Sequence, residues 1–344
     1  METLLLAPEE VGRAAEIIRR GGIVAMPTET VYGLAGNALD GGTVKKIFEA
    51  KGRPADNPLI VHISDISQIY GLVRVFPEKA KILAEKFWPG PLTIILPKSD
   101  KIPDEVSAGL DTVAIRYPSH PLAQKLISLS MPLAAPSANL SGSPSPTTMR
   151  HVMDDMNGRI DAVLDGGECE VGVESTVISL AGDVPVVLRP GGITVEMLRN
   201  TIGEVEIASA VINPLAEGEK AESPGMKYKH YSPKADVVLV DGNDEEFISF
   251  VNSQMGQKLA VICYEEDKDL ITAERIVVGK KGDYSAFAHN LFSALRRADE
   301  LGCNIVYSRC PETAGMGLAV YNRIVRAAGF DIHLLVNSGK EGVQ

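Results

Sequence analysis

Residues 213–235 have no apolar periodicity, and they divide this chain into two parts that each alternate short apolar strands with amphipathic helices. The stretch reads NPLAEGEKAESPGMKYKHYSPKA, with three prolines, two glycines and charges of both signs. Such a composition is typical of a linker. A chain of 344 residues is also too long for one typical core. We therefore expect two domains, residues 1–212 and 236–344, joined by a linker and flap at 213–235.

The first part predicts an α/β domain with a mixed sheet. Apolar runs predict strands at residues 23–26, 59–63, 92–96, 113–116, 133–135, 176–180 and 186–188. Amphipathic stretches predict one helix that begins at Pro8 and ends before Gly21, and further helices at 44–50, 79–87, 121–129 and 195–201. Several of these strands follow one another too closely for a helical crossover, so antiparallel pairs are expected among them.

The second part predicts a smaller, Rossmann-like open sheet. Its expected strands are residues 237–240, 259–264, 275–278 and 304–307, and its expected helices are 245–253, 284–301 and 318–328.

Composition narrows the classes of function. A net charge of −11 argues against sequence-independent binding of nucleic acid over the whole surface, although it leaves room for a local basic groove. The four cysteines show no CxxC spacing, which favours free thiols in a reducing compartment over a zinc site. The start of the sequence lacks a basic segment followed by an apolar run, and no run of about 18 apolar residues occurs. These features predict a cytoplasmic protein without a membrane span.

The richest concentration of polar chemistry lies between Pro27 and His62. It contains a hydroxyl-rich turn (Thr28, Thr30 and Tyr32), the basic pair Lys51 and Arg53, and an apolar run that closes on His62. A core does not need this density of polar groups beside apolar strands. A site that binds an anion and a small polar substrate does need it.

Further cations stand at the ends of predicted strands. Arg116 precedes Tyr117-Pro118, and Arg189 precedes Pro190-Gly191. Taken alone, Lys51 and Arg53 are explained equally well as cations on the C-terminal dipole of a helix. Together with Arg116 and Arg189 they match the edge of the sheet where α/β folds bind ligands, and they could neutralise a polyphosphate. No P-loop motif and no GxGxxG turn is present, so such a site must be built differently.

Two hydroxyl-rich loops complete the set of candidates. The run Pro136–Gly142 follows an apolar strand, and Glu174-Ser175 opens another. Each of these loops taken alone is more often a structural turn. Beside the cations, small donors at strand ends would let a phosphate approach.

Five separated motifs carry a family resemblance. They are PTETVYGL at 27–34, KGRP with NPL at 51–59, SAN at 137–139, ST at 175–176 and LRPG at 188–191. In this order they resemble the YrdC-type threonylcarbamoyl-AMP synthases, whose K-x-R and S-x-N pairs are met by Lys51 with Arg53 and by Ser137 with Asn139. The resemblance covers roughly residues 5–205. The linker and the second α/β domain resemble the longer, two-domain branch of that family.

The resemblance implies a reaction in which L-threonine, bicarbonate and ATP give L-threonylcarbamoyladenylate, pyrophosphate and water, with Mg²⁺ on the phosphates. The product would supply N6-threonylcarbamoyladenosine formation in tRNA through a partner transferase. Direct contact with tRNA is left open.

The resemblance also implies roles for individual residues. Lys51 and Arg53 would be catalytic, and no covalent nucleophile or protein-held metal is expected. The threonine site would comprise Thr30, His62, Arg116, Ala135 and Ser175. The ATP site would comprise Arg53, Asn57, Thr112, Ser137, Asn139, Ser145, Arg189, His230 and Tyr231. The run MKYKHY, residues 226–231, is interpreted as a lid that excludes water from a labile carbamate and adenylate.

Three alternatives remain at this point. The YrdC-like fold is also discussed as an RNA-binding surface, so a non-catalytic module for tRNA or double-stranded RNA is the main alternative, which the net charge disfavours. Carbamoyl transfer for hydrogenase maturation would be accompanied by cysteine-rich zinc modules, and this chain has four scattered cysteines. A YciO-like protein would share the fold without the activity, and the intact K-x-R and S-x-N pairs argue against it.

Overall fold

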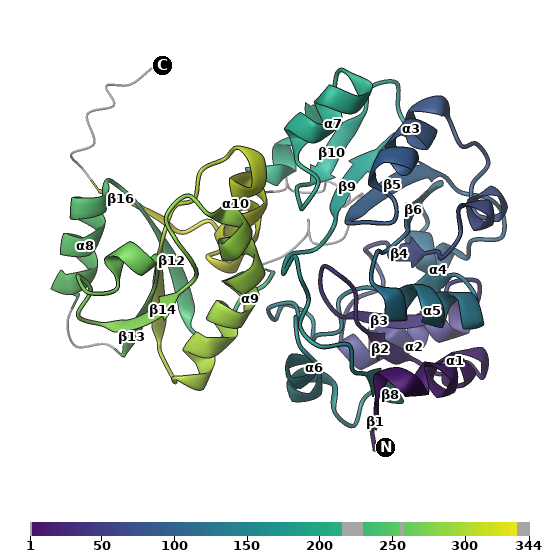
Figure 1. The fold of residues 1–344 in the computed structure, drawn as a ribbon, viewed down its shortest axis with the longest axis horizontal. Coiled ribbons are helices and arrows are strands. Elements are labelled where there is room, and N and C mark those ends of the chain that lie inside the picture. The colour runs from purple at the N-terminus through teal and green to yellow at the C-terminus, as the bar shows by residue number, and fades with distance from the viewer. Residues whose placement is uncertain (1, 215–229, 255–257, 336–344) are drawn as a thin grey trace. The chain divides into compact units, whose positions relative to one another are not determined.

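The computed structural model describes residues 2–214, 230–254 and 258–335. It forms two compact units (Figure 1). Unit 1 comprises Met1–Ser141 with Ser145–Tyr228, and unit 2 comprises Gly142–Pro144 with Lys229–Gln344. Most of the expected linker, including residues 226–229 of the expected lid, lies outside the described residues.

Unit 1 is built on an eleven-stranded mixed sheet in the order β1-β8-β2-β3-β7-β4-β6-β5-β9-β10-β11. The strands are β1 (Leu4–Leu6), β2 (Val24–Met26), β3 (Gly33–Asn37), β4 (Ile60–His62), β5 (Leu92–Pro97), β6 (Thr112–Arg116), β7 (Leu133–Ala134), β8 (Ala162–Leu164), β9 (Thr176–Ser179), β10 (Val186–Arg189) and β11 (Glu206–Ile207). β4 pairs in parallel with β6, whereas β5 pairs antiparallel with β6. The predicted mixed sheet is thus confirmed.

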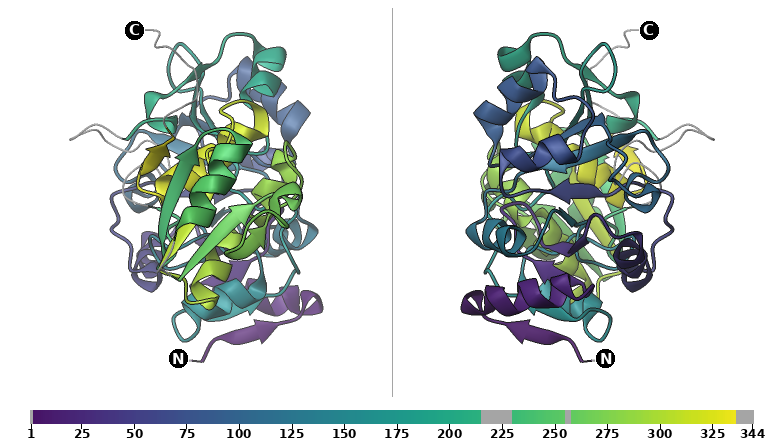
Figure 2. Two further views of the ribbon diagram at one scale, coloured as in Figure 1. Left: turned by 90° about the vertical axis from the view of Figure 1, so that its left-hand side faces the viewer. Right: turned by 90° about the vertical axis from the view of Figure 1, so that its right-hand side faces the viewer.

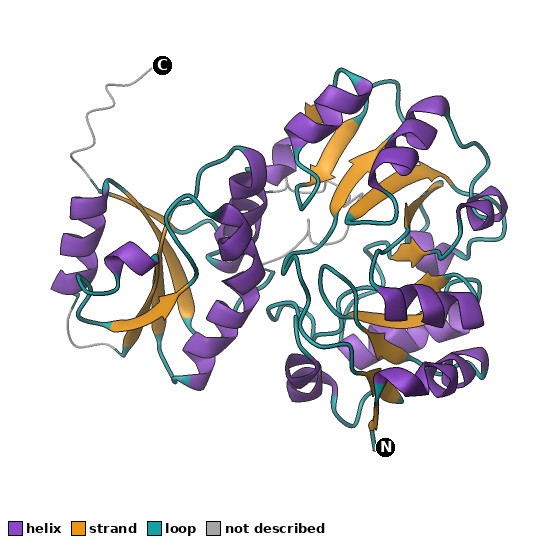
Figure 3. Ribbon diagram, in the orientation of Figure 1, coloured by secondary structure: helices purple, strands orange, loops and turns teal. Residues whose placement is uncertain are grey.

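Seven α-helices accompany this sheet among the described residues of unit 1 (Figure 3). They are α1 (Val11–Arg19), α2 (Gly41–Lys51), α3 (Glu78–Phe87), α4 (Asp104–Ser107), α5 (Pro121–Leu129), α6 (Met149–Met156) and α7 (Val195–Ile202). Short 3-10 turns occur at Pro8–Glu10, Ile66–Gly71 and Ser209–Val211. The single helix expected to begin at Pro8 is therefore a 3-10 turn followed by α1.

Apolar burial holds α1 and α5 against the sheet. Ala14, Ala15 and Ile18 of α1 are fully buried in one cluster with Leu126 of α5 and Leu133 of β7. A second cluster lies on the β4-β6-β5-β9-β10 part of the sheet, and its members are Ile60, Ile95, Ala114, Val177, Leu188 and Ala210. This second cluster is important for the site because it continues the sheet face that carries the polar strand ends.

Unit 2 is a five-stranded parallel sheet in the order β14-β13-β15-β12-β16. Its strands are β12 (Asp236–Asp241), β13 (Leu259–Cys263), β14 (Glu274–Val277), β15 (Ile305–Arg309) and β16 (Ile332–Leu334). Helix α8 (Asp244–Ser253) lies on one face of the strands, and α9 (Tyr284–Glu300) and α10 (Gly315–Ala327) lie on the other (Figures 1 and 2). The predicted open sheet is confirmed.

The structure adds short elements that the apolar pattern did not predict: β1, β3, β8, β11 and β16, with α4 and α6. Most of these elements are too short to show a period. β3 has the sequence GLAGN, whose two glycines resemble a turn. All four cysteines are free, as expected. Among the described residues, no helix combines the length and the apolar character needed to cross a bilayer.

A buried ion pair joins the end of β15 to the 3-10 turn Glu265–Asp267, which follows β13 in unit 2. Arg309 Nη2 lies 2.8 Å from Asp267 Oδ1, and the two side chains are 10% and 8% exposed. The guanidinium also stacks over the ring of Phe247 at 4.1 Å. Asp244, which is half exposed, lies 3.3 Å from Arg309 Nη1.

Arg309→Met is expected to loosen unit 2, because it leaves the Asp267 carboxylate buried without its cation. Loss of one partner of a buried pair costs about 3–5 kcal/mol. Hydrogen exchange of the full chain should show a loss of protection of this size in peptides from β13 and β15. The double variant Arg309→Met, Asp267→Leu should recover most of it. Unchanged exchange in the single variant would contradict this account.

Candidate active site

Lys51 holds the end of α2 against the loop that follows β7 and carries Ser137 and Asn139, here called the S-x-N loop. Helix α2 starts at an Asp40 cap and ends at Lys51 because Gly52 adopts a left-handed conformation, with φ of 59°. The Lys51 Nζ donates to the main-chain carbonyls of Ser137 and Asn139. The Ser141 N–H donates in return to the Lys51 carbonyl at 2.9 Å. Side chain and main chain of one residue thus hold three points of the loop.

The same lysine is 3% exposed. Burial, helped by the nearby charge of Arg53, lowers the pKa of Lys51 to about 7. Arg53 itself is half-buried, with its Nη2 donating to the Asn57 carbonyl at 3.1 Å. The K-x-R pair therefore contains one buried cation that holds a loop and one that is more accessible.

A row of polar side chains crosses the sheet at one level. His62 of β4 is in register with Arg116 of β6, which is in register with Thr93 of β5. Thr93 Oγ1 lies 2.8 Å from the hydroxyl of Ser175, at the start of β9. Cross-strand partners project from the same face of a sheet, so these side chains lie together on it.

Arg189 closes this row at the end of β10. Its Nε donates to the Ser175 carbonyl at 3.0 Å, and its Nη2 donates to the Ser175 hydroxyl at 3.2 Å. Arg189 is 6% exposed, and Ser175 is completely buried. The structure thus brings together three residues of the predicted threonine site, His62, Arg116 and Ser175, and Arg189 of the predicted ATP site.

His62 is neutral at physiological pH. Its Nδ1 lies 3.1 Å from the Ile60 carbonyl, and the side chain is 2% exposed. Burial and the charge of Arg116 lower the pKa of His62 to about 3. The imidazole can therefore offer one donor and one acceptor, without a charge of its own.

The hydroxyl-rich turn is fixed by its own hydrogen bonds. The hydroxyls of Thr28 and Thr30 lie 2.8 Å apart, and the Tyr32 hydroxyl donates to the Gly167 carbonyl at 2.8 Å. The Ala138 N–H donates to the Tyr32 carbonyl at 2.8 Å, which places the S-x-N loop beside the turn. Ala135, which lies between β7 and the S-x-N pair, donates its N–H to the Ile60 carbonyl at 3.1 Å.

Ser145 and Asn139 are both buried in unit 1. The Ser145 hydroxyl donates to Oε1 of Glu174, the residue that precedes Ser175. Hydrogen bonds therefore connect the far end of the S-x-N loop to the Ser175 end of the row.

Thr112 is not part of this group. It begins β6, four residues before Arg116, which is about 13 Å along a strand. It lines a cavity of about 600 Å³ at the other end of the same sheet face, together with Ile95, Ser179, Val186, Leu188 and residues 208–210. The second apolar cluster, which includes Ile60 and Ala114, lies between the two ends.

His230 and Tyr231 belong to unit 2. Tyr231 is 1% exposed, with φ of 65°. Its ring centroid lies 5.2 Å from that of Phe292, and Arg323 lies over the ring at 5.9 Å. The Tyr231 ring is thus part of the core of unit 2.

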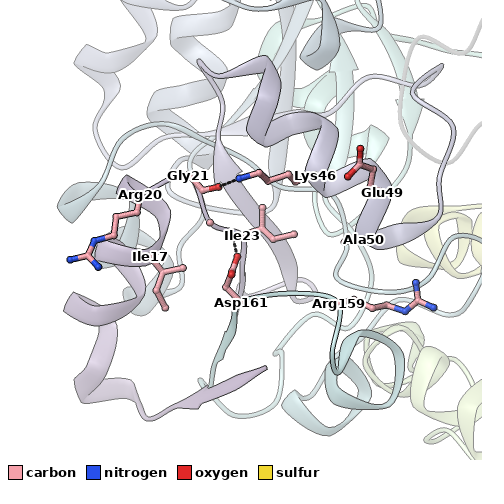
Figure 4. A pocket seen from close by; sticks show the side chains of 10 residues that line it. Ile17, Arg20, Gly21, Ile23, Lys46, Glu49, Ala50, Arg159 and Asp161 are labelled. Atoms are coloured by element: carbon pink, nitrogen blue, oxygen red, sulfur yellow. Dashed lines mark hydrogen bonds between the residues drawn. The ribbon is translucent and has the colours of Figure 1, made fainter. Parts of the chain in front are cut away.

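Another cavity, of about 560 Å³, lies beside α1 and α2 and contains none of the predicted site residues (Figure 4). Lys46 Nζ donates to the Gly21 carbonyl at 2.7 Å, and Asp161 Oδ2 accepts from the Ile23 N–H at 2.8 Å. Two of its charged side chains therefore already bind main chain.

Sequence reasoning assigned no role to three buried polar residues of the site: Glu29, Thr93 and Glu174. Glu29 Oε1 lies 2.9 Å from Arg116 Nη2. A signal existed for Thr93, because a hydroxyl interrupts the apolar strand LTIIL. For Glu29 the signal was a carboxylate between the two threonines of the turn.

Comparison with known protein families gives matches to both parts of the chain. The family model described as "Telomere recombination" (Sua5, YciO and YrdC) matches residues 16–191. The model described as "Threonylcarbamoyl-AMP synthase, C-terminal domain" matches residues 193–329.

Curated relatives match nearly the whole length. A Pyrococcus abyssi protein named threonylcarbamoyl-AMP synthase is 48% identical over 330 residues, which cover 93% of this chain and 94% of the relative. A Bacillus subtilis protein of the same name is 47% identical over 325 residues, with 93% of each chain covered.

Two solved structures of Pyrococcus abyssi Sua5 have the same fold, each 44% identical to this chain. The complex with L-threonine has a TM-score of 0.90, covering 97% of this chain and all of the other. A variant with an adjacent histidine and tyrosine replaced by alanine has a TM-score of 0.91, covering 97% of this chain and 98% of the other.

Gly191→Ala is expected to damage the site, because a Cβ there would lie 2.5 Å from the Thr176 nitrogen and 2.6 Å from the Glu174 carbonyl oxygen. Main-chain atoms cannot yield as a flexible side chain does, so Ser175 would move away from Arg189. Binding of L-threonine, measured by calorimetry, should weaken at least tenfold. The matched control is Gly182→Ala, whose Cβ would meet no atom within 4 Å. Equal affinities in the two variants would refute this interpretation.

Neutral His62 should make unit 1 less stable in acid. In the unfolded chain the His62 imidazole takes up a proton as the pH falls below about 6.5. In the folded protein it stays neutral until about pH 3. Between pH 7 and pH 5 the wild type should lose about 2 kcal/mol more than His62→Asn. Urea unfolding followed by the fluorescence of Trp88, the single tryptophan, reports this difference. Parallel pH dependence in the two proteins would exclude a neutral His62.

Proposed function

The chain belongs to the threonylcarbamoyl-AMP synthase family in its two-domain form, and we propose that its unit 1 carries out the synthase reaction. Unit 1 joins L-threonine, bicarbonate and ATP into threonylcarbamoyl-AMP and releases pyrophosphate and water. One observation carries the proposal most strongly. The buried row from His62 through Arg116 and Ser175 to Arg189 is connected to the far end of the S-x-N loop by the hydrogen bond from Ser145 to Glu174, the residue before Ser175. Amino-acid and phosphate groups can therefore be held side by side.

L-Threonine binds at the polar row. Arg116 pairs with its carboxylate, as a guanidinium does in charge-assisted hydrogen bonds. Neutral His62 and the hydroxyls of Thr30 and Ser175 bond its polar groups, and Ala135 lies against its methyl group. The threonine complex of the Pyrococcus abyssi relative supports this choice of amino acid.

ATP extends from the row along the sheet face. Arg53, Ser137, Asn139, Ser145 and Arg189 hold the phosphates, and Asn57 lies nearby. The nucleoside passes over the second apolar cluster, and its base enters the cavity that Thr112 lines. The separation of about 13 Å between Thr112 and Arg116 leaves room for an adenosine and its α-phosphate between the base end and the amino-acid end.

Positioning supplies much of the rate. The threonine amine and bicarbonate form a carbamate, whose oxygen attacks the α-phosphate, and holding the reactants together removes most of the entropic cost. Negative charge develops on the α-phosphate and on the departing pyrophosphate, where Arg53 and Arg189 stabilise it. Lys51 contributes by holding the loop that presents Ser137 and Asn139. Mg²⁺ arrives with the nucleotide phosphates and neutralises part of their charge.

His230 and Tyr231 form the single His-Tyr dipeptide of this sequence. The relative whose adjacent histidine and tyrosine were replaced supports a role for this pair. We assign the pair to ATP, with the Tyr231 ring supporting His230 from within the core of unit 2. The product passes to a transferase that modifies tRNA, and we place this reaction in the cytoplasm. The RNA-binding alternative is not favoured, since relatives at 47–48% identity over most of the chain are named as the synthase.

Pyrophosphate release from Mg²⁺-ATP tests this function. Release should require both L-threonine and bicarbonate, and omission of either should reduce it to background. Arg53→Ala should lower kcat/KM about 100-fold, as loss of one donor to a developing anion does. Arg13→Ala, an exposed cation on α1, is the matched control and should leave the rate unchanged. Release that ignores threonine would overturn the proposal.

A further inference from the structure

Glu29 places a buried negative charge inside the proposed threonine site. It is 5% exposed, and its main chain is fixed because the Val171 N–H donates to its carbonyl at 2.7 Å. Its carboxylate lies 2.9 Å from Arg116 Nη2, but neither of its oxygens accepts a hydrogen bond from the residues that the structure describes. A buried carboxylate in this state keeps a large desolvation cost.

Arg116 also has hydrogen-bonding groups that lack a partner among the described residues. Its Nε and Nη2 have no hydrogen-bond acceptor among the described residues, although the side chain is 5% exposed. The two side chains therefore form an ion pair that leaves bonding capacity on both partners. The Arg116 guanidinium can still donate hydrogen bonds, and the Glu29 carboxylate can still accept them. Such a site fits a ligand that carries a negative and a positive charge.

Among the residues that the structure describes, Arg116 is the cation that forms an ion pair with Glu29. His120 and Cys169 also interact electrostatically with it. Burial lowers the pKa of His120 and raises the pKa of Cys169 to about 12, so both are neutral near pH 7. Glu168 also interacts electrostatically with Cys169. The buried carboxylate before Ser175, Glu174, accepts from the Ser145 hydroxyl.

An α-amino acid is a zwitterion, and the two open groups match its two charges. If the site had to bind only a carboxylate, Glu29 beside Arg116 would oppose binding by like-charge repulsion. An ammonium group removes that conflict, because it needs a buried acceptor. We propose, on the basis of the proposed function, that Glu29 binds the ammonium group of L-threonine and takes the proton that must leave before nitrogen can attack bicarbonate.

The proton balance of this step is complete. The ammonium gives one proton to the Glu29 carboxylate and becomes a neutral amine with a free electron pair. The nitrogen then forms a bond to the bicarbonate carbon, and the bond from that carbon to the hydroxyl breaks. The departing hydroxide takes a second proton from nitrogen and leaves as water. The carbamate remains, and Glu29 returns its proton to solvent.

The wild-type protein provides a test that needs no variant. Calorimetry compares L-threonine with 2,3-dihydroxybutanoate of matching configuration, which has a hydroxyl in place of the ammonium. The wild type should bind L-threonine at least 100-fold more tightly. Equal affinity for the two ligands would overturn the proposal.

Glu29→Gln removes the charge with little change of shape. It should weaken L-threonine binding at least tenfold and strengthen binding of the hydroxy acid, because the like charge beside Arg116 is gone. Its kcat/KM for threonine should rise nearly tenfold for each pH unit from 7 to 9, because the variant depends on amine that has already lost its proton in solution. The wild type should rise less steeply. Glu29→Asp should show an intermediate effect, and it replaces the glutamine variant if that protein does not fold.

Glu170→Gln is the matched control, because Glu170 is exposed and close to Val171. It should behave as the wild type in binding and in pH profile. A wild type without threonine-dependent pyrophosphate release would refute the proposed function itself. A wild type with that release, together with a Glu29→Gln variant that keeps the wild-type affinity and pH profile, would refute the role of Glu29 alone.

Discussion

The site depends on the three hydrogen bonds between Lys51 and the S-x-N loop. They join the end of a helix to a segment 86 residues further along the chain. A lysine can do this only when its ammonium is buried among carbonyls, and the low pKa of Lys51 shows the cost of that burial. Ser137 and Asn139 are consequently presented from a loop whose main chain is fixed, as preorganised catalysis requires.

The sheet face adds a second kind of order. The strand-end register aligns His62, Arg116 and Thr93, and Ser175 and Arg189 extend the same row. Apolar side chains occupy the next level of the strands, and a cavity lies beyond them. One pleated surface thus passes from charged to apolar, which suits a ligand with a charged end and an aromatic end.

Local sequence patterns predicted many of the helices and strands, but not the contacts between distant residues. Helix α5 was predicted with both ends correct, because Pro121 begins it and an apolar stripe continues to Leu129. Strand β3 was missed, since GLAGN has too little apolar pattern. The pairing of Glu29 with Arg116 and of Thr93 with Ser175 could not be read from the sequence, because these partners are more than 80 residues apart. Thr112 and Arg116 are neighbours in the sequence, but an extended strand separates them.

Strand β6 carries Thr112 at its first residue and Arg116 at its last. Because both side chains belong to one rigid, hydrogen-bonded segment, the strand fixes the distance between the cavity and the polar row. Its neighbours β4 and β5 can change in sequence without altering this length. An elongated ligand must therefore match the backbone rise of four residues, and a shorter ligand cannot reach both Thr112 and Arg116 at once.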